Sequence, residues 1–260
     1  MQKKFFCMLM SAIFLISSVV MAAEIQGNGF IEVEGIKYFS NDINPVTGKP
    51  YTLDELRRMA VVDGYRILAE ELGDLHISAV TIMKNAMLDD TVKTEVEKTI
   101  RNSKVTVTRD SENNFYAKVR LNLYGGANSI ANIVVPKDTK VEPFPKFNPK
   151  FETIDSNYTG LIIDLSGQEV STAILPKIKS VSGKEVYAFQ FLNRNVVVSR
   201  GMVNYSDGSN NSRAGNNPLT IQAMFVEDCD VVVSDDDAEK ILAANSKSNF
   251  LKNCMVVFVK

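Results

Sequence analysis

Apolar residues recur with helical spacing in two segments of the N-terminal half. In residues 53–72, leucine, isoleucine, valine and alanine return every three to four positions, which predicts a helix with one buried face. Thr52 and Glu55 have the spacing of a capping box, in which a hydroxyl and a carboxylate satisfy free amides at a helix start. Gly73 suits the end of this helix. A second helix is predicted to begin at Asp89, followed by apolar residues about one turn apart.

Alternation with a period of two predicts strands on either side of these helices. Residues 115–123 alternate apolar with polar side chains, and residues 104–109 do the same before a turn-forming segment. The two segments are expected to pair as an antiparallel hairpin that is buried on one face. Residues 30–36 and 75–83 are further predicted strands.

The pattern changes after residue 125. Gly125 and Gly126 are followed by four closely spaced prolines, which resist regular structure and favour extended chain. Residues 126–157 are therefore predicted to be a proline-rich linker, in which residues 130–135 either remain irregular or add a strand to a neighbouring unit.

A second unit is predicted over residues 158–260. Ser234 and Asp237 form a capping pair for one helix, and residues 255–259 are a continuous apolar run typical of a strand buried on both faces. Further strands are predicted at residues 161–165, 196–205, 219–226 and 231–233. The predicted fold class is α+β, with two small α/β layered domains, residues 24–125 and 158–260, joined by the linker.

Residues 1–23 have the features of a signal peptide. Lys3 and Lys4 precede an uncharged apolar stretch, and small residues follow at Ala22 and Ala23, where cleavage is expected. The alternative is an uncleaved anchor, but the stretch is slightly short and contains three serines. No cysteine occupies the cleavage point, so lipid attachment is not expected. The predicted location is the periplasm, peripheral to the outer membrane at most, and the chain meets a membrane only through the signal peptide before cleavage.

The charge of the chain argues against nucleic acid as a partner. The formal net charge is −2, and it becomes −4 once the two lysines of the signal peptide are removed, because no acidic residue precedes Glu24. Nucleic-acid binding depends on clustered lysine and arginine, and the sequence has no basic stripe.

The inventory of chemically active residues is small. His76 is the single histidine and is interpreted as a strand-surface residue without a role, since no local motif completes a triad or a metal set around it. Cys229 and Cys254 are either bridged in the oxidising periplasm or buried as free thiols. We predict no catalytic residue, no cofactor and no metal site. Calcium at the acidic residues 228–237 or in the polar loop 206–218 is a weaker alternative to a helix start and an exposed loop.

Two stretches resemble known envelope proteins. Residues 56–70 (LRRMAVVDGYRILAE) and the hairpin end at residues 119–125 (VRLNLYG) resemble the twenty-kilodalton lipoprotein family of bacterial envelopes and the N-terminal domain of flagellar assembly protein T. Residues 158–164 (YTGLIID), with PKI at 176–178 and GKEVY at 183–187, are similar to the second half of exported proteins that share this N-terminal domain. The resemblance implies a structural protein of the envelope or the flagellar motor, with no catalytic residues.

Two functions follow as expectations. The first is a non-catalytic periplasmic protein that binds other envelope proteins, in an outer-membrane or flagellar-type assembly, with self-association through a sheet edge as one mode. The alternative is a small-molecule or ion-binding module with its site between the two units and residues 206–218 as a lid. A hydrolase is a third hypothesis for which the sequence nominates no residue.

Overall fold

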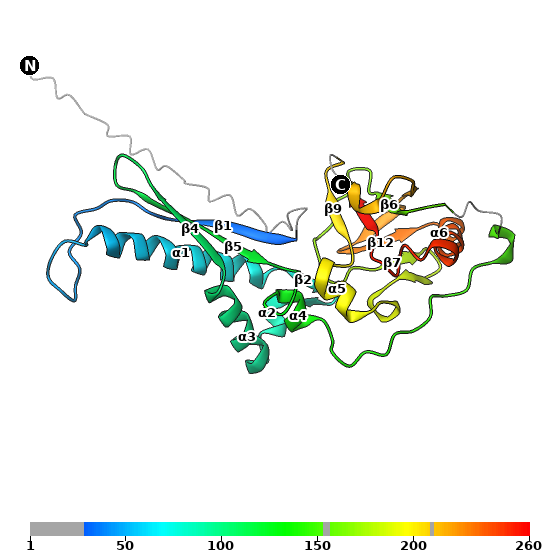
Figure 1. Ribbon diagram of the computed structural model, residues 1–260, viewed down its shortest axis with the longest axis horizontal. Helices are drawn as coiled ribbons and strands as arrows, with labels where there is room; N and C mark the ends of the chain where they lie inside the picture. The colour runs from blue at the N-terminus through cyan, green and yellow to red at the C-terminus, as the bar shows by residue number, and fades with distance from the viewer. Residues whose placement is uncertain (1–28, 153–156, 209–210) are drawn as a thin grey trace, which may run out of the picture.

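The protein has two domains that lie end to end along its long axis (Figure 1). The computed structural model describes residues 29–152, 157–208 and 211–260, so the predicted signal peptide lies outside the described residues. The chain is α+β, and its second domain begins at residue 160, which confirms the predicted fold class. Buried apolar side chains of both domains belong to one continuous core.

The first domain is a three-stranded antiparallel sheet with a long helix against one face (Figure 1). The strands lie in the order β1 (Phe30–Lys37), β5 (Phe115–Asn122) and β4 (Lys104–Arg109), and the helix is α1 (Leu53–Gly73). The predicted hairpin is confirmed, since β4 pairs with β5 in antiparallel register. Its one-sided burial is confirmed too, because alternate β5 residues are buried: Phe115, Ala117, Val119 and Leu121.

Helix α1 begins and packs as its sequence predicts. Thr52 and Glu55 form both hydrogen bonds of the capping box. Gly35 of β1 and Gly64 of α1 meet at the centre of the contact, where a Cβ on Gly35 would lie 2.6 Å from the Cα of Gly64. Two residues without side chains therefore let the strand and the helix approach backbone to backbone.

Short elements fill the end of the first domain that faces the second. They are β2 (His76–Ser78), β3 (Thr81–Ile82), α2 (Met83–Ala86), α3 (Asp90–Arg101) and α4 (Ile130–Val134). The single strand predicted over residues 75–83 is wrong, because a turn after Ser78 splits it and Met83 begins α2. The start of α3 is confirmed, since the Asp89 carboxylate accepts hydrogen bonds from two amides of its first turn.

The predicted linker is not a free tether. Its first part forms α4, which Ser129 caps and which buries Ile130 and Ala131, so the alternative of a strand there is wrong. Residues 136–148, which we call the connecting segment, run extended along the second domain to η1 (Pro149–Phe151) (Figure 1). Phe144 packs on Phe191 with ring centroids 5.3 Å apart, which fixes the segment to the second domain.

The second domain contains two four-stranded sheets. The parallel sheet has the order β10 (Pro218–Gln222), β6 (Gly160–Asp164), β13 (Val256–Val259), β9 (Asn204–Ser206). The mixed sheet has the order β11 (Phe225–Glu227), β12 (Asp230–Val233), β7 (Ile178–Ser180), β8 (Glu185–Tyr187). Its helices are η2 (Phe189–Phe191), α5 (Arg194–Arg200), η3 (Ser212–Ala214) and α6 (Asp235–Ser248). The last strand, predicted to be buried on both faces, is confirmed: Val256, Val257 and Phe258 of β13 are buried, and the strand lies between β6 and β9.

Two strand predictions in this domain are wrong in part: of residues 196–205, predicted as a strand interrupted near Gly201, only the end lies in a strand, β9. The valines at 196–198 lie in α5, because the Asn193 side chain caps a helix there and Gly201, with φ of 76°, ends it. The strand predicted over 219–226 is divided into β10 and β11, which join different sheets.

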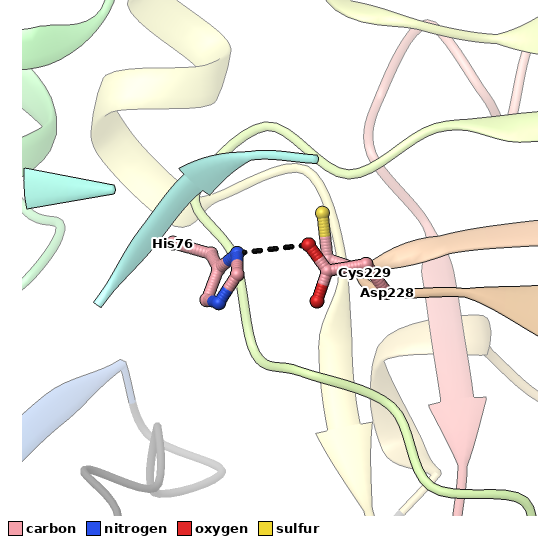
Figure 2. A group of neighbouring side chains, drawn as sticks. All are labelled: His76, Asp228 and Cys229. Carbon is pink, nitrogen blue, oxygen red and sulfur yellow. Dashed lines mark ion pairs between the residues drawn. The ribbon is translucent and has the colours of Figure 1, made fainter. Parts of the chain in front are cut away.

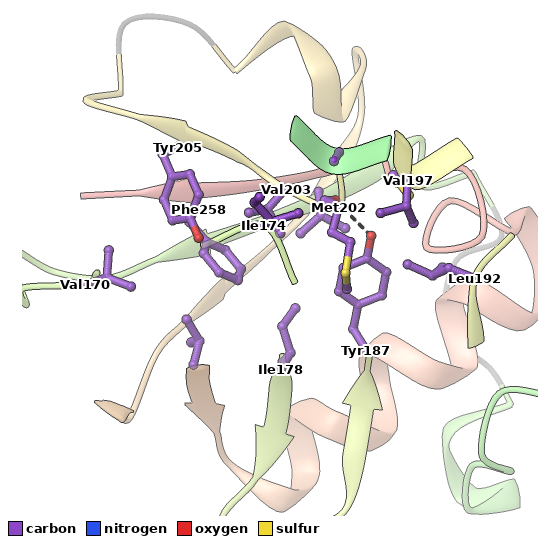
Figure 3. Close-up of a cluster of buried hydrophobic side chains, with 14 of the residues drawn as sticks. Val170, Ile174, Ile178, Tyr187, Leu192, Val197, Met202, Val203, Tyr205 and Phe258 are labelled. Carbon is purple, nitrogen blue, oxygen red and sulfur yellow. Dashed lines mark hydrogen bonds between the residues drawn. The ribbon is translucent and has the colours of Figure 1, made fainter. Parts of the chain in front are cut away.

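Aromatic and aliphatic side chains fill the core of the second domain (Figure 3). The rings of Tyr205 and Phe258 meet edge to face with centroids 5.8 Å apart. The hydroxyl of buried Tyr187 donates to the Met202 carbonyl oxygen at 2.8 Å. The phenol groups are thereby satisfied inside an apolar environment, as buried tyrosines require.

Candidate functional site

His76 lies where the first domain meets the second. It opens β2 directly after the end of α1, and it forms an isolated parallel bridge with Ala173. The Ile174 amide donates to the His76 carbonyl oxygen at 3.0 Å, and the Leu175 amide donates to that of Ile77 at 2.8 Å. These bonds fix the backbone of the histidine against the second domain.

Asp228 and Cys229 form the two-residue turn between β11 and β12. Asp228 has a φ of 61°, a left-handed conformation that aspartate tolerates better than most residues. The Ser171 amide donates to the Asp228 carbonyl oxygen at 2.9 Å and holds the turn in place. The turn is therefore anchored to the same 171–175 segment that holds His76.

The three side chains converge in space (Figure 2). The Nδ1 atom of His76 lies 3.1 Å from Oδ2 of Asp228, and one ligand atom from each of His76, Asp228 and Cys229 lies within 4.8 Å of the others. Nδ1 is buried and makes no hydrogen bond in the described part of the chain, although the Asp228 carboxylate lies at ion-pair distance. A buried polar atom without a hydrogen bond is uncommon in folded proteins, so this nitrogen distinguishes the cluster from an ordinary surface ion pair.

The electrostatics of the cluster keep the thiol protonated. Burial raises the pKa of Cys229 to about 12, and the negative charges of Asp230 and Asp228 act in the same direction. The sulfur faces Oδ1 of Asp230 at 3.9 Å. A nucleophilic cysteine requires an accessible thiolate, whereas Cys229 is fully buried. The arrangement therefore does not favour cysteine-based hydrolysis, despite the histidine and carboxylate beside it.

Asp230 lies next to Cys229 and is held by two lysine residues. Its carboxylate accepts from the Lys177 amide at 2.8 Å and pairs with the Lys179 ammonium at 2.7 Å. The hydrogen bond that the Lys179 ammonium donates to Asp230 raises the pKa of Lys179, so the ammonium stays charged. Because Asp230 is already committed to these partners, Asp228 is the carboxylate that remains to face His76.

Of the two alternatives for Cys229 and Cys254, a disulfide or two buried thiols, the structure has the second, with both residues buried as free thiols. Cys254 lies beside the Tyr187 hydroxyl, and burial raises the pKa of its thiol. Cys229 instead belongs to the cluster with His76. The sequence left the free-thiol alternative open, and the structure has that alternative.

The acidic residues considered for calcium have separate structural roles. Asp235, Asp236 and Asp237 occupy the first turn of α6, where Ser234 accepts from the Asp237 amide, so the interpretation as a helix start is confirmed. Asp228 faces His76 instead.

Residues 206–218, predicted to be an exposed loop and a candidate lid, are partly packed into the second domain. Residues 209 and 210 lie outside the described residues. Ala214 is fully buried, and Arg213 donates to the Arg200 and Gly201 carbonyl oxygens. The segment therefore lacks the freedom of a lid around Ala214.

Three hollows lie along α3 in the first domain, and two of them are also lined by residues of other elements. One of these two, of about 460 Å³, is lined by Lys104, Arg120 and neutral polar side chains, and the other is about 330 Å³. Ligand pockets are usually apolar and enclosed, with a few polar groups. The hollows differ from that description, and none of the three includes His76, Asp228 or Cys229.

The sequence does not indicate the cluster, because His76 lies about 150 positions before Asp228 and Cys229 and no motif links them. The only local signal was the adjacency of Asp228 and Cys229 at a turn. Among the described residues, no helix combines the length and apolar character needed to cross a membrane.

Comparison with known proteins bears on the second domain. No curated protein matches the sequence. A family model described as the second domain of Treponema pallidum Tp0624 matches residues 160–260. The match begins at the first residue of β6, so the domain boundary in the structure and the start of this similarity coincide. Residues 160–260 are thus similar to a domain of a spirochaete protein.

Proposed function

We propose that the chain is an exported, non-catalytic protein of the bacterial envelope that acts by binding another envelope protein. The observation that supports this proposal most strongly is a concentration of exposed apolar side chains between β1 and α1. We call residues 38–53, which end at the first residue of α1, the distal loop. Five of the twelve large hydrophobic residues exposed in the described chain lie there: Tyr38, Phe39, Ile43, Val46 and Leu53. Contiguous exposed apolar surface is typical of interaction sites.

The distal loop presents these side chains in an ordered conformation. Asn44 accepts from the Val46 amide at 2.9 Å and donates to the Glu55 carboxylate at 2.8 Å. The Phe39 amide donates to the Asn114 side chain, which ties the loop to the β4–β5 hairpin. An ordered loop loses less conformational entropy on binding than a mobile one, so this arrangement supports a recognition role.

The position of the distal loop suits a contact with a separate molecule. In Figure 1 it lies at the end of α1 that points away from the second domain. Val46, at the tip, is 90% exposed.

A protein surface fits this loop better than an anionic lipid surface. Exposed acidic and basic residues alternate around it: Asp42, Lys49, Asp54, Arg57 and Arg58. Anionic membranes attract clustered lysine and arginine, whereas aromatic side chains with a mixed-charge rim are typical of protein interfaces. The resemblance of residues 56–70 to envelope lipoproteins and to flagellar assembly protein T directs attention to outer-membrane and flagellar basal proteins as partners.

The test compares two substitutions in tagged protein recovered from crosslinked cells. Val46→Asp places a charge in the distal loop, and Val181→Asp places the same charge on an exposed position of the second domain. We expect outer-membrane or flagellar basal proteins to be enriched with the wild type and with Val181→Asp, and to be lost with Val46→Asp. Equal recovery with both variants, recovery of a second copy only, or recovery of lipid without protein would overturn the proposal.

A further inference from the structure

We propose that His76, Asp228 and Cys229 bind one divalent transition-metal ion, for which Zn²⁺ fits best, at the junction of the two domains. No local sequence motif indicates this site. It depends on the tertiary convergence of β2 with the β11–β12 turn, and it is independent of the proposed binding of an envelope protein.

The donor set matches the chemistry of zinc. Imidazole nitrogen, thiolate sulfur and carboxylate oxygen are the three ligand types that Zn²⁺ takes in proteins. Hard ions such as Mg²⁺ and Ca²⁺ prefer sets made only of oxygen, so the sulfur of Cys229 argues against them. With a thiolate, a carboxylate and a neutral imidazole, the two positive charges of the ion are balanced inside a partly buried site.

The geometry requires only a small contraction. Zinc bonds of roughly 2.0–2.3 Å in a tetrahedron place ligand atoms about 3.3–3.8 Å apart. The three atoms already lie within 4.8 Å of one another, and the Nδ1–Oδ2 pair is at 3.1 Å. Hydrogen bonds from Ser171 and Ile174 hold both ligand-bearing backbones, so side-chain rotation alone can complete the set.

The unsatisfied nitrogen points to the same interpretation. Nδ1 of His76 is buried and lacks a hydrogen bond among the described residues, although a carboxylate oxygen lies beside it. A metal ion between the two groups would supply the missing partner to the nitrogen.

The site leaves one coordination position open. The side chains of His76 and Asp228 are 26% and 40% exposed, while Cys229 is fully buried, so solvent reaches the cluster at the histidine and the aspartate. Three protein ligands with an open fourth position suit a water molecule or a donor group from a bound partner.

Binding would join the domains and release a proton. His76 comes from the first domain and the other two ligands come from the second, so the ion would oppose their separation. Because a thiol must lose its proton to bind a metal ion, metal affinity should increase with pH.

The experiment titrates the mature protein with Co²⁺ and Zn²⁺ after treatment with a chelator. The affinity tag must lack histidine, because His76 is the single histidine of the chain. Cobalt reports a sulfur ligand through thiolate-to-metal charge-transfer absorption, and calorimetry with zinc gives stoichiometry and affinity. The variants are Cys229→Ser, His76→Gln and Asp228→Asn. Cys254→Ser is the matched control, since that residue is also a buried free thiol but lies outside the cluster.

We expect one ion per chain, a higher melting temperature with zinc, and charge-transfer absorption that Cys254→Ser retains and Cys229→Ser abolishes. Loss of a group that hydrogen-bonds to a metal ligand lowers the affinity for the metal about 10–100-fold. Loss of a direct ligand should therefore weaken zinc binding by at least about 100-fold. A melting curve of each variant in chelator shows whether that variant folds. If a cysteine variant does not fold, His76→Gln and Asp228→Asn still test the proposal. No saturable binding by the wild type, or unchanged binding by folded His76→Gln and Asp228→Asn, would overturn the proposal.

Discussion

Replacing Gly35 with alanine tests how the first domain holds the distal loop. The added Cβ would lie 2.6 Å from the Cα of Gly64 and would also meet main-chain atoms of Ala60 and Gly64. Backbone atoms in the middle of a helix cannot move aside as a flexible side chain can. Overpacking of this kind typically costs about 1–3 kcal/mol, and purely main-chain contacts place Gly35→Ala at about 3 kcal/mol.

A second glycine in the same domain provides the control. Gly48 in the distal loop has a φ of 67° and nothing within 4 Å of an added Cβ. Gly48→Ala should therefore lose only about 1–2 kcal/mol, which is the cost of a left-handed alanine. The two substitutions add the same atom and differ only in whether the cost is steric or conformational.

The assay is urea unfolding of both variants, combined with amide hydrogen exchange. Because a two-domain protein need not unfold in one step, exchange at α1 amides localises the effect to the first domain. The Gly35→Ala variant should unfold at much lower urea and lose protection in α1 and β1. A loss smaller than that of Gly48→Ala, or unchanged protection in α1, would refute the backbone-to-backbone contact.

Three further outcomes follow from buried or hydrogen-bonded groups. Thiol reagents should modify both Cys229 and Cys254 after unfolding without reductant, and neither in the native protein; modification of neither thiol after unfolding, or of only one, would contradict the free-thiol state. Hydrogen bonds from Ser182 lower the pKa of Asp235, so its charged form stabilises the fold above the unfolded-state pKa of about 3.9, and this contribution is lost as pH falls through the lower folded-state value. Asp235→Asn should therefore flatten the pH dependence of the unfolding free energy in acid, and an unchanged slope would contradict this role. Tyr187→Phe should cost about 1 kcal/mol in urea unfolding, since it leaves a buried carbonyl oxygen without its 2.8 Å donor, and no change would contradict the bond.

Local signals in the sequence were sufficient for the β4–β5 hairpin and the long helix of the first domain. Alternation along residues 115–123 depends on one open sheet face, and the capping box at Thr52 depends on a few neighbouring residues. Both patterns are local, so they survive without knowledge of tertiary contacts. This is why the hairpin and α1 agree with their predicted positions.

Local signals were misleading where tertiary packing or a single cap determined the outcome. The valines of α5 have the composition of a strand, but Asn193 and Gly201 define a short helix whose apolar side enters the core. The prolines of the connecting segment correctly predicted extended chain, but its attachment through Phe144 to Phe191 depends on a contact between distant residues.

The candidate metal site was beyond prediction for a similar reason. His76 was interpreted as a surface residue without a role, because no metal-binding spacing surrounds it in the sequence. The cluster forms only because residues 171–175 hold β2 and the β11–β12 turn together. Contacts that join residues this far apart depend on topology rather than on pattern.

The proposal of an envelope-binding protein is tested most directly by a photo-activated crosslinker placed at position 46 in living cells. We expect a specific adduct with an outer-membrane or flagellar basal protein from position 46, and none when the crosslinker replaces Val181, which is exposed in the second domain. An absence of protein adducts from position 46, or the same adducts from both positions, would contradict it.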